Sequence, residues 1–239
     1  MPSRAFKLLV ATDPETVGRT AASMIAHQFR AKPDTVLCTA SGASPIPTYD
    51  HLASLTPGQT GQIRIVKLDE WLGLPMTDPH TCESFHRRHL LTPLAISDDR
   101  YVTINSQPAD PGAECARVSA AIAQLGGIDL AILGIGRNGH LGLNEPNAAL
   151  HPFCHVEHLA PASMQHPMLD GAIPGVHRGI TLGMHEILSA RRILLLATGP
   201  QKAAPIRTLL ARQVTTTFPA SFLWLHPDVT CLCDAAAAP

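Results

Sequence analysis

The 239-residue chain carries 18 Lys and Arg residues against 19 Asp and Glu residues, which gives a formal net charge of −1. This balance leaves no basic excess to neutralise a nucleic-acid backbone, and no apolar run approaches the roughly 20 residues that cross a bilayer, so nucleic-acid and membrane partners are excluded. The six cysteines form no C-x-x-C pair and are typical of free thiols in a reducing cytoplasm. We expect one soluble, cytoplasmic domain over residues 1–239.

Short apolar runs rich in β-forming residues alternate with helical patterns along the chain. The Asp13-Pro14-Glu15 sequence predicts the start of a helix that continues to about Lys32, and Pro111 with Glu114 predicts the start of another that ends at Gly126-Gly127. Such alternation predicts an α/β fold with a doubly wound, mostly parallel, Rossmann-like sheet and helices on both faces. The predicted strands are 6–11, 35–40, 63–69, 128–135, 192–199 and 229–233.

Two segments rich in Pro, His and Gly interrupt this alternation, residues 70–85 and 144–178. Long segments of this kind inside a compact domain are commonly binding loops or lids. We expect the longer one, about 144–178, to be a lid of the single domain.

The residues that follow the predicted strands are the first candidates for a site, because ligands of open α/β sheets bind beyond the carboxyl ends of the strands. Ser41, Gly42, Ala43 and Ser44 follow the second strand, and Lys202 follows the strand at 192–199. Small hydroxyl residues before a helix can bind a phosphate through backbone N–H groups, with Lys202 as the cation. The alternative is an ordinary turn with a serine cap. The G-K-[ST] sequence of a nucleotide P-loop is absent, so ATP is not indicated.

Asp69 and Glu70 stand at the end of the predicted strand 63–69. A carboxylate at such a position either caps the next turn or carries a proton. A rigidly held carboxylate above a pocket is suited to remove a proton next to a carbonyl group.

The sequence GIGRNGHLGLNEP (134–146) contains the G-x-G-x-x-G pattern of dinucleotide-binding turns, and Glu157 lies at about the right distance for a ribose ligand. That interpretation requires a helix after Gly139, which Gly142 and Pro146 disfavour. We therefore predict no dinucleotide cofactor. As a catalytic loop, the same stretch offers His140 as an acid or base with Glu145 to orient it, and the alternative is a structural turn histidine.

Thirteen histidines also raise the question of a metal site. His151, His155 and His158 have a spacing that would place them on one face of a helix, but Pro152 and Pro161 disfavour that helix. We therefore predict no metal ion and no other cofactor. A G-x-S-x-G nucleophile elbow is also absent.

Taken together, these motifs resemble those of the glucosamine-6-phosphate deaminase and 6-phosphogluconolactonase superfamily, in order over nearly the whole chain. The N-E-P and L-D-E-W sequences favour the amino-sugar phosphate deaminases, and TCESF (81–85), HRGITLG (177–183) and PASFLWLH (219–226) make the chain most similar to the galactosamine-6-phosphate deaminase/isomerase branch. The motifs that carry the resemblance are TASGASP (39–45), KLDEWLGLP (67–75), GIGRNGHLGLNEP (134–146) and TGPQKA (198–203).

The resemblance implies an enzyme that converts galactosamine 6-phosphate to tagatose 6-phosphate and ammonia without a cofactor. It implies that His140 opens the sugar ring with Glu145 beside it, and that Asp69 moves a proton from C2 to C1. The implied substrate- and phosphate-binding residues are Ser41, Gly42, Ala43, Ser44, Glu70, Gly136, Gly139 and Lys202. The alternatives are a glucosamine-6-phosphate deaminase, a sugar-lactone hydrolase that uses His140 as the base, and a non-catalytic sugar-phosphate sensor. The expected partner is a small sugar phosphate. For the oligomeric state, a homo-oligomer is the alternative to a monomer.

Two positions depart from the glucosamine branch. Asn138 stands where that branch carries an aspartate, and an amide can orient His140 but cannot stabilise its protonated form by charge. We also expect a phosphate-contacting arginine within 159–169, where Met164 or Gln165 stands instead. We therefore expect Lys202 to supply the positive charge that binds the phosphate, with Arg178 as the alternative that takes the place of the missing arginine.

Overall fold

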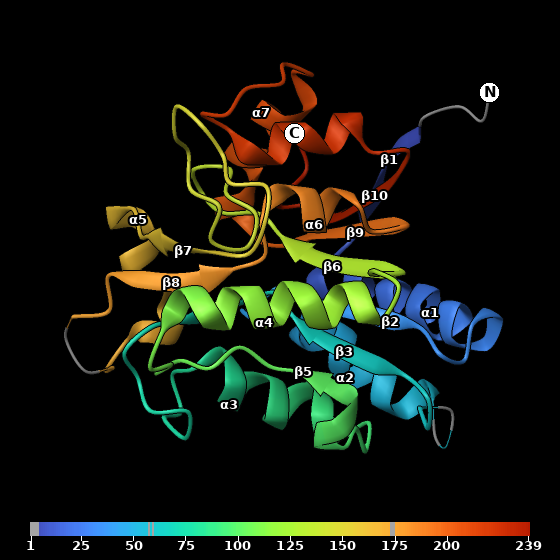
Figure 1. Ribbon diagram of the computed structural model, residues 1–239. Helices are drawn as coiled ribbons and strands as arrows, with labels where there is room; N and C mark the ends of the chain where they lie inside the picture. Colours follow the sequence, from blue (N-terminus) through green and yellow to red (C-terminus); the bar gives the residue numbers. More distant parts are fainter. Residues whose placement is uncertain (1–4, 57, 59, 173–174) are drawn as a thin grey trace.

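The computed structural model describes residues 5–56, 58, 60–172 and 175–239 of the chain. Its centre is a seven-stranded sheet in the order β1-β10-β9-β6-β2-β3-β5, in which every neighbouring pair is parallel (Figure 1). This confirms the predicted fold class. The strands are β1 (Ala5–Ala11), β2 (Val36–Thr39), β3 (Arg64–Lys67), β5 (Tyr101–Val102), β6 (Leu130–Gly134), β9 (Arg192–Ala197) and β10 (Asp228–Asp234).

Helices cover both faces of this sheet. Apolar residues of α1 (Pro14–Ala31), α2 (Ile46–Leu55) and α3 (Cys82–His86) pack on one face, and those of α4 (Pro111–Gln124), α6 (Met184–Leu188) and α7 (Ala203–Leu210) on the other. Alternate residues of each strand serve the two cores, because side chains alternate across a strand. Shorter turns of helix are the π-helical Arg87–Leu91, α5 (Pro161–Met164), and the 3-10 turns Asp98–Arg100, Pro167–Leu169, Pro200–Lys202 and Pro219–Leu225.

The two predicted helix starts are confirmed. Asp13 caps α1 by accepting a hydrogen bond from the backbone N–H of Thr16 at 2.8 Å, and Asp110 caps α4 in the same manner. Gly126, with a φ of 78°, follows the end of α4, as the pattern predicted.

A second, antiparallel sheet corrects the prediction for residues 63–69. It consists of β4 (Asp69–Trp71), β8 (Arg178–Thr181) and β7 (His155–His158), in the order β4-β8-β7. The predicted strand is wrong at its end, since β3 stops at Lys67 and Asp69 begins β4. Its partner β8 lies more than 100 residues away along the chain, so no local pattern could show where one strand ended and the next began.

The two interrupting segments contain more regular structure than expected. Residues 70–85 include most of β4 and the start of α3, and residues 144–178 include β7 and α5. Positions 173 and 174 of the second segment lie outside the described residues. His155 and His158 lie on β7, which is a strand, and His151 stacks on His155 with ring centroids 4.4 Å apart.

The strand order produces a crevice between β2 and β6. From β2 the chain proceeds through β3 to β5 at one edge, whereas from β6 it proceeds through β9 to β10 in the opposite direction. The loops after β2 and β6 therefore diverge, and ligands of doubly wound sheets bind at such a point.

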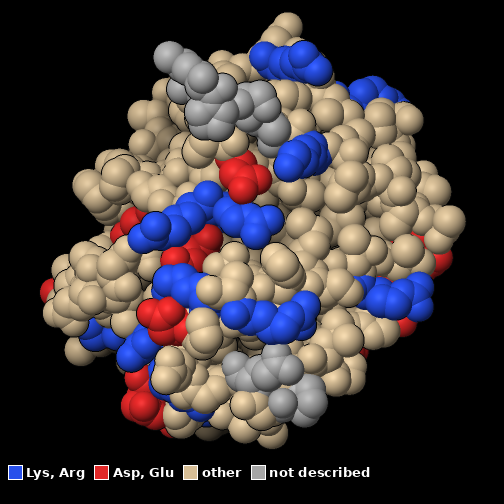
Figure 2. Space-filling view, turned by 90° about the vertical axis from the view of Figure 1, so that its right-hand side faces the viewer, with Lys and Arg blue, Asp and Glu red and all other residues tan. Residues whose placement is uncertain are grey.

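Charges are mixed on the face shown in Figure 2, where Lys and Arg side chains lie beside Asp and Glu side chains among wide uncharged areas. Among the described residues, every helix is too short or too polar to span a bilayer.

Candidate active site

A cavity of about 500 Å³ lies at the crevice between β2 and β6. Loops that follow β2, β6 and β9 contribute to its walls, together with β4 and residues 162–168. Motifs far apart in the sequence therefore meet in one place. The predicted site residues that line the cavity are Ser41, Gly42, Ala43, Ser44, Asp69, Gly136, Asn138, His140 and Lys202.

The loop after β2 forms one end of the cavity. Gly42 has a φ of 107°, a left-handed conformation that glycine adopts without steric cost. Ser44 Oγ accepts a hydrogen bond from Thr198 Oγ1 at 3.1 Å, which ties this loop to the loop after β9. Pro45 rather than a serine precedes α2 and makes no side-chain cap, so the serine hydroxyls are not used as helix caps here.

Two cations stand near this loop. Lys202 lines the cavity and donates from Nζ to the carbonyl oxygen of Ile135 at 2.6 Å. Burial, with repulsion from Arg137, lowers the pKa of Lys202. Arg137 also lines the cavity, and sequence reasoning missed it. Its place inside the glycine-rich motif, three residues before His140, was the available signal.

His140 is part of a compact polar group. Its Nδ1 lies 3.5 Å from Glu145 Oε2, and Asn138 Nδ2 donates to the same oxygen at 2.7 Å. Asn138 Oδ1 in turn accepts from the backbone N–H of His140 at 3.2 Å. Burial raises the pKa of Glu145, but the hydrogen bond to His140 and its charge, with Ser163 and Asn138, outweigh burial and lower it to about 2. Glu145 is therefore ionised and orients the imidazole.

Two glycines allow this loop to approach its neighbours. A Cβ atom at Gly136 would overlap the His140 imidazole, so the ring lies directly over the backbone there. A Cβ atom at Gly142 would lie 2.6 Å from Thr181 Oγ1 and 3.6 Å from Asp69 Oδ2. The close approach at Gly142 brings the His140 loop against Asp69.

Asp69 is a buried carboxylate, 8% exposed, at the start of β4. Burial, and then the negative charge of Glu70, raise its pKa to about 7, although Lys67 and the thiol of Cys82 act in the opposite direction. The Cys82 Sγ lies 3.8 Å from Asp69 Oδ1 and 3.1 Å from Ser41 Oγ, so the thiol joins this carboxylate to the loop after β2. A carboxylate with a pKa near neutrality is an effective proton carrier.

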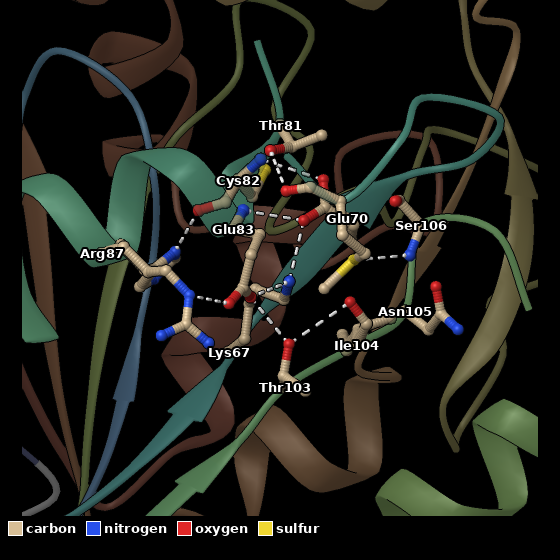
Figure 3. A network of polar contacts seen from close by, with 12 residues as sticks. Lys67, Glu70, Thr81, Cys82, Glu83, Arg87, Thr103, Ile104, Asn105 and Ser106 are labelled. Carbon is tan, nitrogen blue, oxygen red and sulfur yellow. Dashed lines mark hydrogen bonds and ion pairs between the residues drawn. The ribbon is translucent and has the colours of Figure 1, made fainter. Parts of the chain in front are cut away.

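Glu70 points away from the cavity into a buried network (Figure 3). It is fully buried and pairs with Lys67 Nζ at 2.8 Å, and Lys67 also pairs with Glu83 at 2.9 Å. Glu70 further accepts hydrogen bonds from the backbone N–H groups of Cys82 and Glu83 at the start of α3. The side chain thus fixes α3 against β4 and does not face a ligand, in contrast to the sequence-based expectation.

Other predicted residues also lie outside the cavity walls. Gly139 packs its backbone against Phe218, and Glu145 stands behind His140. Neither Met164 nor Arg178 contributes to the described walls, whereas Gln165 does. Arg178 is exposed at the start of β8, so its suggested contact with a phosphate in this cavity is not supported.

Other residues in the walls also escaped sequence reasoning, among them Trp71, Arg88, Ser163 and His166. Ser163 Oγ lies 3.3 Å from His140 Nδ1. Ser163 and His166 belong to the Pro-rich segment in which no periodic pattern indicated which side chains would turn inward. The pairing of β7 with β8, the hydrogen bond from the Ala160 N–H to Glu145 Oε1 at 3.3 Å and the packing of the residues around Met168 position that segment.

The residues after Gly139 form turns with a bridge between Leu141 and Asn144. The helix that a dinucleotide-binding turn requires is therefore absent from this described stretch, which removes the structural basis of the G-x-G-x-x-G interpretation.

A family model and curated relatives match nearly the whole length of this chain. Residues 13–231 match the family model described as glucosamine-6-phosphate isomerases/6-phosphogluconolactonase. The chain is 46% identical over 207 residues to a putative deaminase, AgaI, of Escherichia coli K12, covering 85% of this chain and 82% of that protein. It is 38% identical over 232 residues to a glucosamine-6-phosphate deaminase of Bacillus pumilus, covering 94% and 95%.

Solved structures share the fold. A monomeric glucosamine-6-phosphate deaminase superposes with a TM-score of 0.91 at 34% identity, covering 97% of this chain and 98% of that one. A 6-phosphogluconolactonase from Leishmania guyanensis superposes with a TM-score of 0.78 at 19% identity, covering 98% and 97%. At that identity the second similarity concerns the fold alone.

Proposed function

The chain belongs to the glucosamine-6-phosphate isomerase/6-phosphogluconolactonase family, and on this premise we propose that it deaminates a 2-amino-2-deoxy-hexose 6-phosphate to a ketose 6-phosphate and ammonia. The observation that carries the proposal is one cavity in which Asp69, a base with a pKa of about 7, shares the walls with His140 and the Ser41–Ser44 loop. Galactosamine 6-phosphate, giving tagatose 6-phosphate, is the substrate that the TCESF and HRGITLG motifs favour.

The phosphate binds first in this scheme. Backbone N–H groups and hydroxyls of residues 41–44 donate hydrogen bonds to the phosphate oxygens, and Lys202 supplies positive charge. Binding energy from this remote group fixes C1 and C2 of the sugar relative to Asp69, because such energy can be used to hold the reacting atoms in place.

His140 then opens the pyranose ring by moving a proton from the O1 hydroxyl to the ring oxygen. Glu145, already ionised, holds the imidazole by its Nδ1 side and stabilises the protonated intermediate. Asn138 orients both groups through its amide, as its two hydrogen bonds require.

Asp69 removes the C2 proton of the open-chain form and returns it to C1, which converts the aldose to a C2 imine through an enolamine. Water adds to C2, the C2–N bond breaks and ammonia leaves, so one water is consumed for each ammonia released. The raised pKa of Asp69 suits both halves of this proton transfer, since the carboxyl group must accept one proton from C2 and then give up one proton to C1.

The decisive assay is ammonia release from galactosamine 6-phosphate and glucosamine 6-phosphate by the purified protein, with Asp69→Asn as the control. We expect turnover of both with a higher kcat/KM for the galacto epimer, and loss of turnover in the control. Higher activity on the gluco epimer would support the second candidate, which the 38% and 34% identities to glucosamine-6-phosphate deaminases favour.

Exchange of the C2 hydrogen separates this chemistry from its competitors. In deuterium oxide, a deaminase that uses Asp69 introduces deuterium at C1 of the product through exchange of the proton held on the Asp69 carboxyl group with solvent before its transfer, whereas a lactone hydrolase leaves the carbon-bound hydrogens unchanged. Binding of either sugar phosphate without ammonia release would instead indicate a sensor.

We further propose that residues 144–178 act as the lid of the single domain. Ser163, Gln165 and His166 from this segment line the cavity, so its movement would open or close the site. Assembly into homo-oligomers remains a prediction, and the solved relative is described as monomeric.

A further inference from the structure

His166 has an arrangement that fixes its protonation on one ring nitrogen. It precedes the 3-10 turn Pro167–Leu169, and its Nδ1 accepts a hydrogen bond from the backbone N–H of Met168 at 3.2 Å. A nitrogen that accepts carries no proton, so in the neutral ring the proton is on Nε2. This Nε2 lies 3.8 Å from the position of a Cβ atom at Gly42, directly over the loop after β2.

An aromatic side chain stands beside His166. Trp71 packs against the imidazole with ring centroids 5.8 Å apart, and it lines the same cavity. The indole is only 4% exposed, yet its Nε1 has no hydrogen-bond partner within the described residues. Because the Nε1 atom is itself buried, the indole contributes to this part of the cavity as a wall beside the imidazole.

The charges around His166 favour its neutral form. Burial, and then repulsion from His140, Lys202 and Arg137, lower the pKa of His166 to about 4, although Asp170 acts in the opposite direction. These groups stand on the loop after β6, on the turn at Pro200–Lys202 and next to the turn that His166 precedes, and Asp69, Arg88 and His89 line the same cavity. At neutral pH the imidazole therefore offers a hydrogen bond without a charge.

We propose that His166 binds the substrate phosphate as a neutral donor, with Nε2–H donated to a phosphate oxygen held over Gly42. The positive charge that the anion needs then comes from Lys202 and Arg137. His166 thus takes the place, within 159–169, where the sequence resemblance leads us to expect an arginine. This inference deepens the proposed function and rests on its placement of the phosphate.

Calorimetric titration with inorganic phosphate at pH 7.5 tests the assignment in four proteins: the wild type, His166→Leu, His166→Gln and His177→Leu. Removal of a hydrogen bond to a charged group weakens binding by roughly 10- to 100-fold, so we expect that loss in His166→Leu. Gln keeps an N–H donor at about the same reach, and we expect a change of less than about threefold. His177 is an exposed histidine of the same segment and serves as the matched control.

The tautomer provides a second readout that a structural role would not produce. In nitrogen-15 spectra of the wild type before phosphate is added, the His166 ring is neutral with its proton on Nε2 from pH 8 to pH 6, and the Nε2 signal shifts when phosphate binds at pH 8. An unchanged phosphate Kd in His166→Leu, an equal loss in the Gln variant, or an imidazolium signal at pH 6 would overturn the assignment.

Failure of this inference is distinguishable from failure of the proposed function. If the protein releases ammonia from a hexosamine 6-phosphate and His166→Leu leaves KM unchanged, only the role of His166 is wrong. If phosphate binding depends on His166 while neither hexosamine 6-phosphate is turned over, the deaminase proposal is wrong and the binding residue stands.

Discussion

Replacement of Asp69 by Asn should make the folded protein more stable while abolishing turnover. The Asp69 carboxylate is buried, and its pKa of about 7 lies above the ordinary value of 3.8 because the ionised form is costly in this site. Asn has nearly the same shape and carries no charge. It can still accept the contact from Cys82, so the substitution removes the cost of ionisation with little change in packing.

The pH dependence gives the size of this effect. A group whose pKa is raised on folding binds a proton more tightly in the folded state, so stability declines as the pH rises from the unfolded towards the folded value. Between pH 5.5 and a pKa of about 7, the decline is about 2 kcal/mol. Above pH 7 both states are ionised and the decline ends. The stability advantage of Asp69→Asn over wild type should therefore grow by about 2 kcal/mol between pH 5.5 and 8.5.

Urea unfolding at these two pH values, followed by circular dichroism, measures the difference directly. Other titrating groups affect both proteins alike, so the change in the difference reports Asp69 alone. An advantage that is the same at pH 5.5 and 8.5 would show that Asp69 titrates normally, and the assignment of a neutral-pH base would then lose its physical basis.

The remaining predictions concern the same site. Glu145→Gln should destabilise the protein by about 1–2 kcal/mol at pH 7, since a pKa lowered to about 2 stabilises the folded state above the ordinary value of 4.5; the loss should vanish near pH 2 in parallel urea titrations, and a difference that persists there would point to packing. Lys202→Met should raise the KM for the sugar phosphate by about 10- to 100-fold, with a smaller effect on kcat, because it removes the cation at the phosphate loop; an equal KM in steady-state kinetics would contradict that role. The kcat/KM of the wild type should rise with pH through about 7 as Asp69 ionises, and a profile flat from pH 6 to 8 would exclude Asp69 as the base in the free enzyme.

Much of the fold could be predicted from local sequence. The apolar runs at 35–40 and 128–135 predicted β2 and β6, and the helix-start signals at Asp13 and Pro111 predicted the two long helices, because these signals depend on residues within a few positions of one another. The chemistry of the loops was also visible, since a strand end followed by serines or by a glycine-rich histidine motif is a local arrangement.

The sequence did not show which individual side chains point into the cavity and which point away from it. Asp69 and Glu70 are adjacent acids, and only the pairing of β4 with β8 turns the first into the cavity and the second onto Lys67. For the same reason, the sequence alone did not identify His166, which enters the cavity through the folding of a Pro-rich segment over the sheet.

The sequence by itself determined which chemical groups this protein has at the ends of its parallel strands. Helix caps, strand patterns and loop motifs each involve residues that lie within a few positions of one another along the chain. The tertiary structure alone decided which of them meet. Burial and the neighbouring charge of Glu70 raise the pKa of Asp69 to about 7, and a hydrogen bond to Met168 fixes the tautomer of His166. Both properties arise from contacts that exist only after β4, β8 and the segment that follows β7 have come together, since desolvation and charge interactions depend on distance in space and not along the chain.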